Sequence, residues 1–389
     1  MVRLGNICKF QSGGTPNKSK PEYFNGNIPW ITTVALNGGT INQSSTISWI
    51  TELAIQESAA KIVPAHSIMV GTRVGIGKVA INSVPMSTSQ DVISLVDIDD
   101  TKWDKHFICE LILSKNQFLI SQARGATIKG IKIETLSNIQ IPDISLQAQR
   151  HIAAVLDKVS DLIAKRKQQL DKLDEMTKAK FVEMFGEPIS NPHEWKQVAL
   201  RELTTKIGSG ATPRGGRESY QSEGITLIRS MNVYDGRFEY KDLAHITDQQ
   251  AKQLENVTVM KGDVLINITG ASVARSCVVP NNVLPARVNQ HVAIVRCIPG
   301  KLDPIFTNNL FINDSFKRLL LNIGESGGAT RQAITKQQLE ALTIIVPPVE
   351  LQQKFSSFAG QIGNIKLTVE ESLCKMEETR KVLMQRYFG

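Results

Sequence analysis

The sequence predicts a mixed α/β (α+β) protein built as a pseudo-two-fold tandem repeat, with two globular domains separated by two long helices that pair as an antiparallel coiled coil. Three observations predict this fold class. The stretches QSGGTP (Gln11–Pro16) and GSGATP (Gly208–Pro213) are near copies about two hundred residues apart. Two long amphipathic segments align with each other. Elsewhere, short β-branched runs bounded by Gly, Asn, Asp and Pro turns predominate, which is typical of strand-rich domains.

The first long helix is predicted over residues 146–186. Its apolar residues lie three, four or seven positions apart, which is coiled-coil spacing. The residues expected to pair with a second helix are Leu156, Val159, Ile163, Leu170 and Leu173. Gly186 and the nearby Pro188 are a good helix stop.

The second long helix is predicted over residues 349–389, after the pair Pro347-Pro348. Its expected pairing residues are Phe355, Ile362, Val369, Leu373 and Met376. Gly360 and Gly363 weaken its first part by about 1 kcal/mol each relative to alanine. Because each helix has one apolar seam, each needs a partner, and the nearest candidate is the other helix.

The alignment of the repeats predicts the domain organisation. Gln149 aligns with Gln352, and the segments Ile28–Ile41 and Gln90–Val96 align with Ile225–Phe238 and Gln290–Arg296. The expected order is a domain over 1–145, a helix over 146–186, a domain over 187–348 and a helix over 349–389. Within the domains, residues 106–123 and 305–323 are the clearest candidate helices.

Composition narrows the class of protein. The chain has 389 residues, a formal net charge of +8 and a pI near 9.1, which permits a polyanionic partner without requiring one. Its five cysteines are scattered, so neither a disulfide framework nor a metal site is expected, and a reducing cytoplasm fits best. No stretch is apolar enough for a membrane helix, and no secretory signal is visible, so no membrane partner is expected.

Motifs for catalysis are missing. In GTRVGIGKV (residues 71–79), Thr72 stands where a phosphate-binding P-loop needs its first glycine, and Val79 stands where it needs a metal-binding hydroxyl. The two Gly-rich stretches lack the third glycine of a dinucleotide fingerprint. No methyltransferase pocket, nucleophile elbow or carboxylate cluster was found, so we expect no catalytic residues and no cofactor bound by this chain.

Gly-rich turns with basic or amide side chains recur in both halves, which suits recognition of double-stranded DNA. Arg can bridge guanine O6 and N7, Asn or Gln can bridge adenine N6 and N7, and Lys and backbone amides hold phosphates. The candidate DNA-binding residues are Thr15, Lys18, Arg73, Lys78, Arg124, Lys129, Thr212, Arg214, Arg217, Arg229, Asn232, Arg275 and Arg331. The first domain has three arginines and the second has ten, which predicts that the two domains read different bases.

These features resemble the DNA-specificity (S) subunits of type I restriction–modification systems. The resemblance rests on QSGGTP and GSGATP near each domain start, on IPWI and ITLIRSMNV after them, and on long helices ending FVEMFGEP and LMQRYFG. It implies two target-recognition domains that each read half of an asymmetric, bipartite DNA site, with the helices as a spacer. It also implies that two modification (methyltransferase) subunits bring S-adenosylmethionine for adenine N6 methylation. Restriction (translocase and nuclease) subunits, which use ATP and Mg²⁺, would join them for cleavage.

Other interpretations stay open at this point. One is a restriction–modification enzyme with built-in specificity, which the missing catalytic motifs disfavour. A second is a coiled-coil scaffold with two binding heads and no role on DNA. A third is an S-like subunit of another phage-defence or phase-variable methylation system.

Overall fold

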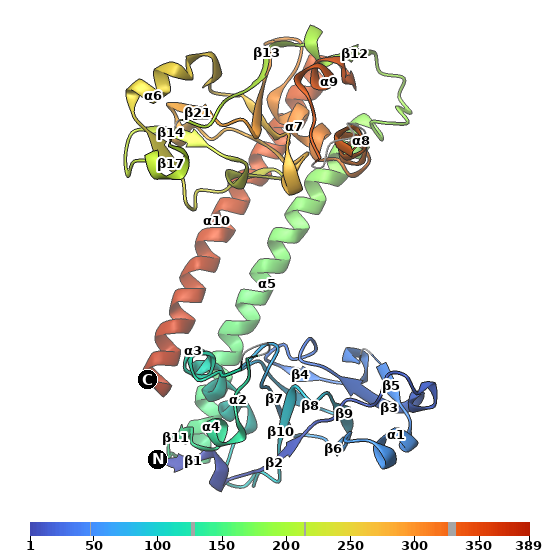
Figure 1. Cartoon of the computed structure of the whole chain (residues 1–389), viewed down its shortest axis with the longest axis vertical. Helices are drawn as coiled ribbons and strands as arrows, with labels where there is room; N and C mark the ends of the chain where they lie inside the picture. Colours follow the sequence, from blue (N-terminus) through green and yellow to red (C-terminus); the bar gives the residue numbers. More distant parts are fainter. Residues whose placement is uncertain (47, 126–128, 214, 326–331) are drawn as a thin grey trace. The chain divides into compact units, whose positions relative to one another are not determined.

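A computed structural model describes residues 1–46, 48–125, 129–213, 215–325 and 332–389. The chain forms two compact units, Met1–Lys167 with Glu371–Gly389, and Gln168–Glu370. Each unit contains one globular domain and parts of both long helices (Figure 1). The boundaries between the two units therefore lie within the long helices, whereas the domain boundaries expected from the sequence lie at the ends of those helices.

The two long helices are α5 (Leu146–Phe185) and α10 (Val349–Phe388), each of 40 residues. In the first unit, Leu156 near the start of α5 shares an apolar cluster with Met384 near the end of α10. In the second unit, Leu173 of α5 packs with Ile362 and Val369 of α10. The early part of each helix thus meets the late part of the other, so within both units the pairing is antiparallel, as the sequence predicts.

The helix ends are also part of the domain cores. Phe355 of α10 is fully buried and packs against Phe181 and Phe185 of α5 and against the core of the second domain. Its ring centroid lies 5.4 Å from that of Phe181 and 5.6 Å from that of Phe185. Leu170 packs against the Leu173 cluster. The other expected pairing residues are half-buried, and their pairing stays a prediction: Val159, Ile163, Leu373 and Met376.

The first domain contains a five-stranded sheet, in the order β2-β10-β7-β8-β4, and a four-stranded sheet, in the order β5-β3-β9-β6. A short pair, β1-β11, joins the domain's two ends. The strands are β1 (Val2–Arg3), β2 (Lys9–Ser12), β3 (Phe24–Ile31), β4 (Thr40–Ile41), β5 (Ser48–Ile50), β6 (Ile62–Val63), β7 (Ile68–Gly71), β8 (Val79–Asn82), β9 (Met86–Thr88), β10 (Val92–Val96) and β11 (Gln140–Ile141).

The second domain repeats this plan. Its sheets run β13-β22-β19-β20 and β17-β14-β21-β18, with short pairs β12-β23 and β15-β16. The strands are β12 (Gln197–Ala199), β13 (Thr204–Ser209), β14 (Ile225–Ile228), β15 (Val233–Tyr234), β16 (Arg237–Phe238), β17 (Ala244–Ile246), β18 (Thr258–Val259), β19 (Val264–Asn267), β20 (Ser276–Val278), β21 (Ala286–Val288), β22 (Val292–Cys297) and β23 (Thr343–Ile345). The fold is therefore mixed α/β with a repeated domain, as predicted.

Short helices cover the sheets. They are α1 (Glu52–Glu57), α2 (Lys105–Ser114), α3 (Asn116–Ser121) and α4 (Ile133–Ser137) in the first domain, and α6 (Asp248–Gln253), α7 (Pro304–Ile312), α8 (Asp314–Glu325) and α9 (Lys336–Ala341) in the second. Each of the two helices expected from sequence is divided in two, at Lys115 and at Asn313. In Figure 1, α2, α3 and α4 lie beside α5, whereas β3, β5 and α1 lie at the other end of the first domain.

The repeat extends to single hydrogen bonds. Gln149 of α5 is buried; its Oε1 accepts from the backbone N–H of Asp104, and its Nε2 donates to the carbonyl of Lys102. Gln352 of α10 is equally buried and makes the same two bonds to Asp303 N and Lys301 O. Both glutamines thus tie a long helix to the residue that caps α2 or α7. This agreement supports the alignment of the two halves at the level of atoms.

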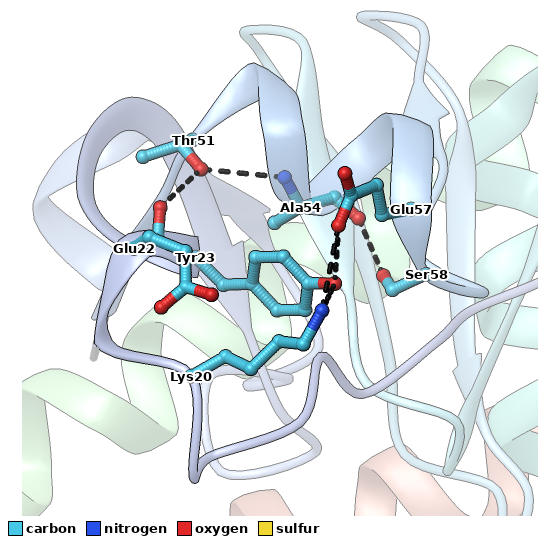
Figure 2. Close-up of polar contacts among 7 residues, drawn as sticks. All are labelled: Lys20, Glu22, Tyr23, Thr51, Ala54, Glu57 and Ser58. Atoms are coloured by element: carbon cyan, nitrogen blue, oxygen red, sulfur yellow. Dashed lines mark hydrogen bonds and ion pairs between the residues drawn. The ribbon is translucent and has the colours of Figure 1, made fainter.

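A small polar cluster fixes the segment that follows the first Gly-rich stretch (Figure 2). The Tyr23 hydroxyl donates to Glu57 Oε2 at 2.9 Å, and Lys20 Nζ donates to the Tyr23 hydroxyl at 2.8 Å. This hydrogen bond to Tyr23 is the main cause of a raised pKa at Lys20. Thr51 caps α1 and donates to the carbonyl of Glu22 at 2.9 Å. The loop that carries Lys18 is therefore anchored at its far end.

Candidate nucleic-acid interface

At each of the two Gly-rich stretches, the backbone passes very close to the backbone of another segment. Gly13 N donates to the Val92 carbonyl at 3.0 Å, and a Cβ at Gly13 would lie 2.2 Å from the Ser89 carbonyl oxygen. In the second domain, a Cβ at Gly210 would lie 1.7 Å from the carbonyl oxygen of Val288. Only glycine permits such approaches, so the requirement at these positions is steric.

The threonine after each crossing holds a neighbouring loop. Thr15 Oγ1 accepts from the backbone N–H of Gln90, at 3.4 Å. Thr212 Oγ1 donates to the side-chain carbonyl of Gln290, which aligns with Gln90. Both threonines are exposed. Their evident contribution is to position residues 89–91 and 289–291, which we call the Gln loops.

The segment that approaches a P-loop in sequence is the tip of a β-hairpin. Strands β7 and β8 pair antiparallel, and Gly77 N and Lys78 O both bond to Gly71. A P-loop instead connects a strand to a helix. The second domain has the equivalent hairpin, β19-β20. The hairpin loops are residues 72–78 and 268–275, and they carry the predicted residues Arg73, Lys78 and Arg275.

A third loop packs on each hairpin. Ile131 N donates to the Thr72 carbonyl at 2.9 Å, and Ile334 N donates to the Ile268 carbonyl at 2.8 Å. In the first domain, the described residues of this loop are 124–125 and 129–131, and its predicted residues Arg124 and Lys129 are exposed. Each domain therefore has one surface made of a hairpin loop, a Gln loop and a third loop, which we call the three-loop surface.

The three-loop surface of the first domain is basic. A hollow of about 470 Å³ is lined by Arg73, Arg124 and Lys132, with Glu134 as its acidic group. Arg73 and Arg124 come from different loops, which the fold brings together around this hollow. Clustered guanidinium and ammonium groups are the side chains that contact DNA phosphates and guanine edges.

The surface of the second domain combines arginine with an aromatic ring. The guanidinium of Arg275 lies over the Tyr234 ring, 4.5 Å from its centroid, and that of Arg237 lies 5.2 Å from it. A hollow of about 460 Å³ next to them is lined by Tyr234, Arg275, His291 and the partly exposed Met231. Stacking on a ring limits the orientations of a guanidinium, which prepares it for directional contacts.

Two predicted residues serve the scaffold of the second domain. Asn232 is fully buried; its Oδ1 accepts from Arg229 N, and its Nδ2 donates to the Glu239 carbonyl. Its amide therefore has no surface to offer to a base. Arg229 is half-buried, donates to the Asp242 carbonyl and lies 5.3 Å from the centroid of the Tyr220 ring.

The structure says little about the surroundings of the remaining predicted DNA-binding residues. Arg214 and Arg331 lie outside the described residues, as does the side chain of Arg217. Lys18 is exposed. DNA contact by these residues and by those of the three-loop surfaces stays a prediction. The structure adds three side chains that sequence analysis did not select: Asp91, Thr269 and His291. The alignment of QDV (residues 90–92) with QHV (residues 290–292) was the available signal.

Comparison with known protein families shows to which family the chain belongs. A family model described as the type I restriction modification DNA specificity domain matches residues 1–175 and again residues 192–374. The chain belongs to this family. The double match reproduces the tandem repeat inferred from the two Gly-rich stretches and the two long helices.

Relatives within the family cover the chain at modest identity. The MjaIX specificity subunit, of a type I restriction enzyme of Methanocaldococcus jannaschii, is 25% identical over 99% of this chain and 91% of its own length. The specificity subunit of the Escherichia coli enzymes EcoR124I and EcoR124II is 33% identical over 41% of this chain and 40% of its own length. The crystal structure of a type I restriction–modification S subunit from M. genitalium has the same fold, with a TM-score of 0.60, 14% identity and coverage of 100% of this chain and 95% of that one.

The described part of the chain offers neither a cluster of metal ligands nor a membrane-spanning helix. Among the described residues, no group of three or more His, Cys, Asp or Glu side chains could hold a metal ion. In the same part of the chain, no helix is both long enough and apolar enough to cross a bilayer.

Proposed function

We propose that this chain is the DNA-specificity subunit of a type I restriction–modification complex, in which each domain reads one half of an asymmetric, bipartite DNA site. One observation carries the proposal: a chain of the specificity family presents the same three-loop surface twice, on one scaffold, with different side chains. A repeated scaffold with changed surface residues is what two modules need to recognise two different half-sites.

The chemistry of the three-loop surfaces fits duplex DNA. Arg73, Arg124 and Arg275 supply the forked donors that match guanine O6 and N7, whereas Lys78 and Lys129 supply point charges for phosphates. The paired helices α5 and α10 link the two domains and fix the spacing between half-sites, by the logic that relates protein geometry to half-site separation.

In this proposal the chain is not an enzyme and binds no cofactor itself. Two methyltransferase subunits dock on it, bring S-adenosylmethionine and methylate an adenine N6 in each half-site. Restriction subunits with ATP and Mg²⁺ cleave unmodified DNA. The exposed polar faces of α5 and α10 provide the area for docking, and the assembly acts on DNA in the cytoplasm.

The test is to express the full chain with its cognate methyltransferase subunit in a host that lacks N6-methyladenine, and to map methylation by long-read sequencing. We expect one bipartite motif with a methylated adenine in each half, and no motif when the chain is omitted. Binding of the purified complex to that motif should weaken linearly in log K against log salt, as phosphate contacts require. An assembled complex that methylates no motif and binds DNA without salt dependence would indicate a scaffold instead.

A further inference from the structure

We propose that residues 73 and 91 in the first domain, and 269 and 291 in the second, are one and the same base-reading position of the repeated fold. In the first domain the pair Arg73–Asp91 selects guanine. In the second domain the pair Thr269–His291, with Met231 beside it, selects thymine. The inference rests on the proposed function, and it assigns this position to side chains that the sequence patterns alone did not single out.

Backbone hydrogen bonds establish the equivalence. Thr72 N donates to the Asp91 carbonyl at 2.8 Å, and Ile268 N donates to the His291 carbonyl at 2.9 Å. The carbonyls of the same two residues, Thr72 and Ile268, each accept from the third loop. The residue that follows, Arg73 or Thr269, therefore emerges at the same place, facing residue 91 or 291.

In the first domain this place holds an arginine and a carboxylate. Arg73 Nη1 lies 3.7 Å from Asp91 Oδ1, and nearly half of the Arg73 side chain is exposed. The backbone of Gly130 lies close to the Arg73 stem, since a Cβ there would be 3.0 Å from Arg73 Cγ. A carboxylate beside one nitrogen orients the guanidinium and leaves its other donors for a planar acceptor pair. Guanine O6 and N7 are that pair in the major groove.

In the second domain the place holds a chain of hydrogen-bonded side chains without a carboxylate. Gln290 Nε2 lies 3.2 Å from His291 Nε2, and His291 Nδ1 bonds to Thr269 Oγ1. Because an amide nitrogen only donates, His291 Nε2 accepts, and the ring proton is on Nδ1, which donates to Thr269. Gln290 in turn accepts from Thr212 of the second Gly-rich stretch.

This chain determines what Thr269 can offer to DNA. The bond from His291 takes one lone pair of the Thr269 oxygen, so the methyl group and a single O–H donor are what Thr269 has left for a base. The side chain of Met231, about 40% exposed, lines the same hollow. The Thr269 methyl group, from the hairpin loop, and Met231, from the helical turn Ser230–Asn232, match the C5-methyl of thymine, and neither offers the paired donors that guanine needs.

The test exchanges the pairs in the full chain, within its methyltransferase complex, and maps the methylated motif. We expect Arg73→Thr with Asp91→His to abolish the guanine requirement at one position of one half-site, with a loss of preference of about tenfold or more. Thr269→Arg with His291→Asp should replace thymine by guanine at one position of the other half-site. Lys61→Ala, an exposed lysine outside the three-loop surface, should leave the motif unchanged.

Two further variants keep the test decisive if an exchanged pair folds poorly. Arg73→Lys keeps the charge and loses the fork, so it should reduce the preference for guanine with little change in the salt dependence of binding. Thr269→Val keeps the methyl group and replaces the hydroxyl by a second methyl, so it should retain thymine. An unchanged motif in both Arg73→Lys and the folded exchange variant overturns the inference. If the unmodified chain gives no bipartite motif, the proposed function fails instead.

Discussion

The two domains share the contacts that hold their folds together and differ in the side chains of their three-loop surfaces. The residues that stabilise the fold are therefore separate from those proposed to recognise DNA. Gln149 and Gln352 make the same bonds in both units, and the glycines of both Gly-rich stretches allow similar backbone crossings. The two glutamines are buried and their loss leaves backbone polar atoms without partners, whereas a side chain at either glycine would clash with a backbone carbonyl, so these positions tolerate little change. The side chains at positions 73 and 269 are only partly exposed, and a change there alters what can bind with less effect on stability than a change in the core.

A second difference lies where each long helix meets its domain. In the first unit, Arg380 of α10 donates to Ser160 of α5 at 2.8 Å and to Glu110 of α2 at 2.7 Å. Glu110 is almost fully buried. Burial raises the pKa of Glu110, and the charge of Arg380 opposes this rise. The aligned positions of the second unit hold Thr177, Gly363 and Asn309, which form no such ionic bridge.

The largest effect is therefore expected from Arg380→Met, which leaves the Glu110 carboxylate buried without its partner. We expect it to lower the free energy of unfolding of the first unit by about 3 kcal/mol at pH 8. A carboxyl with a raised pKa stabilises the folded state at low pH and loses this contribution as pH rises through the folded-state pKa. The deficit should therefore be smaller at pH 5. Denaturant unfolding at both pH values measures it.

Two further variants test the mechanism. Glu110→Leu combined with Arg380→Met removes both charges and should recover most of the lost stability. Thr177→Val, at the aligned position of the second unit, should change stability by less than about 0.5 kcal/mol. A deficit that is equal at both pH values would mean that packing of the arginine stem, rather than the Glu110 charge, is responsible.

The next effect should be the same in both units. Gln149→Leu and Gln352→Leu each leave one backbone N–H and two carbonyls without their side-chain partner. We expect each to cost about 2 kcal/mol, within the range for buried polar groups that lose a partner. Hydrogen exchange should speed up at Asp104 in the first variant and at Asp303 in the second. A large effect in one unit with none in the other would break the equivalence of the repeats.

The sequence predicts the repeat and the helices better than the recognition surfaces. The apolar residues of the helices recur with a period that is visible in the sequence. Because the chain is duplicated, a feature of one repeat can be checked at the aligned position of the other, as with Gln149 and Gln352. The pair Arg73–Asp91 joins residues from separate loops, which only the crossing at Gly13 and the hairpin bring together. Asn232 shows the opposite limit: its residue type suits a base contact, but the fold uses its amide to close a turn.

The smallest effect concerns the glycines of α10. Gly360 and Gly363 align with Asp157 and Ser160 of α5, so the same helix positions carry side chains in the first unit. A Cβ at either glycine would meet no atom within 4 Å, and both glycines line a cavity of about 480 Å³. Alanine should therefore fit, and each substitution should stabilise the second unit by about 0.5–1 kcal/mol in denaturant unfolding.

A matched control for these alanines is Ala179→Gly, at an exposed position of α5, which should lower stability by about the same amount. A destabilising Gly363→Ala would show that the helix needs the glycine's own backbone freedom there. If the alanine variants gain stability but the assembled complex methylates DNA more slowly, the open space beside α10 is used by a partner. The missing side chains would then be a functional difference between the two repeats, of the same kind as positions 73 and 269.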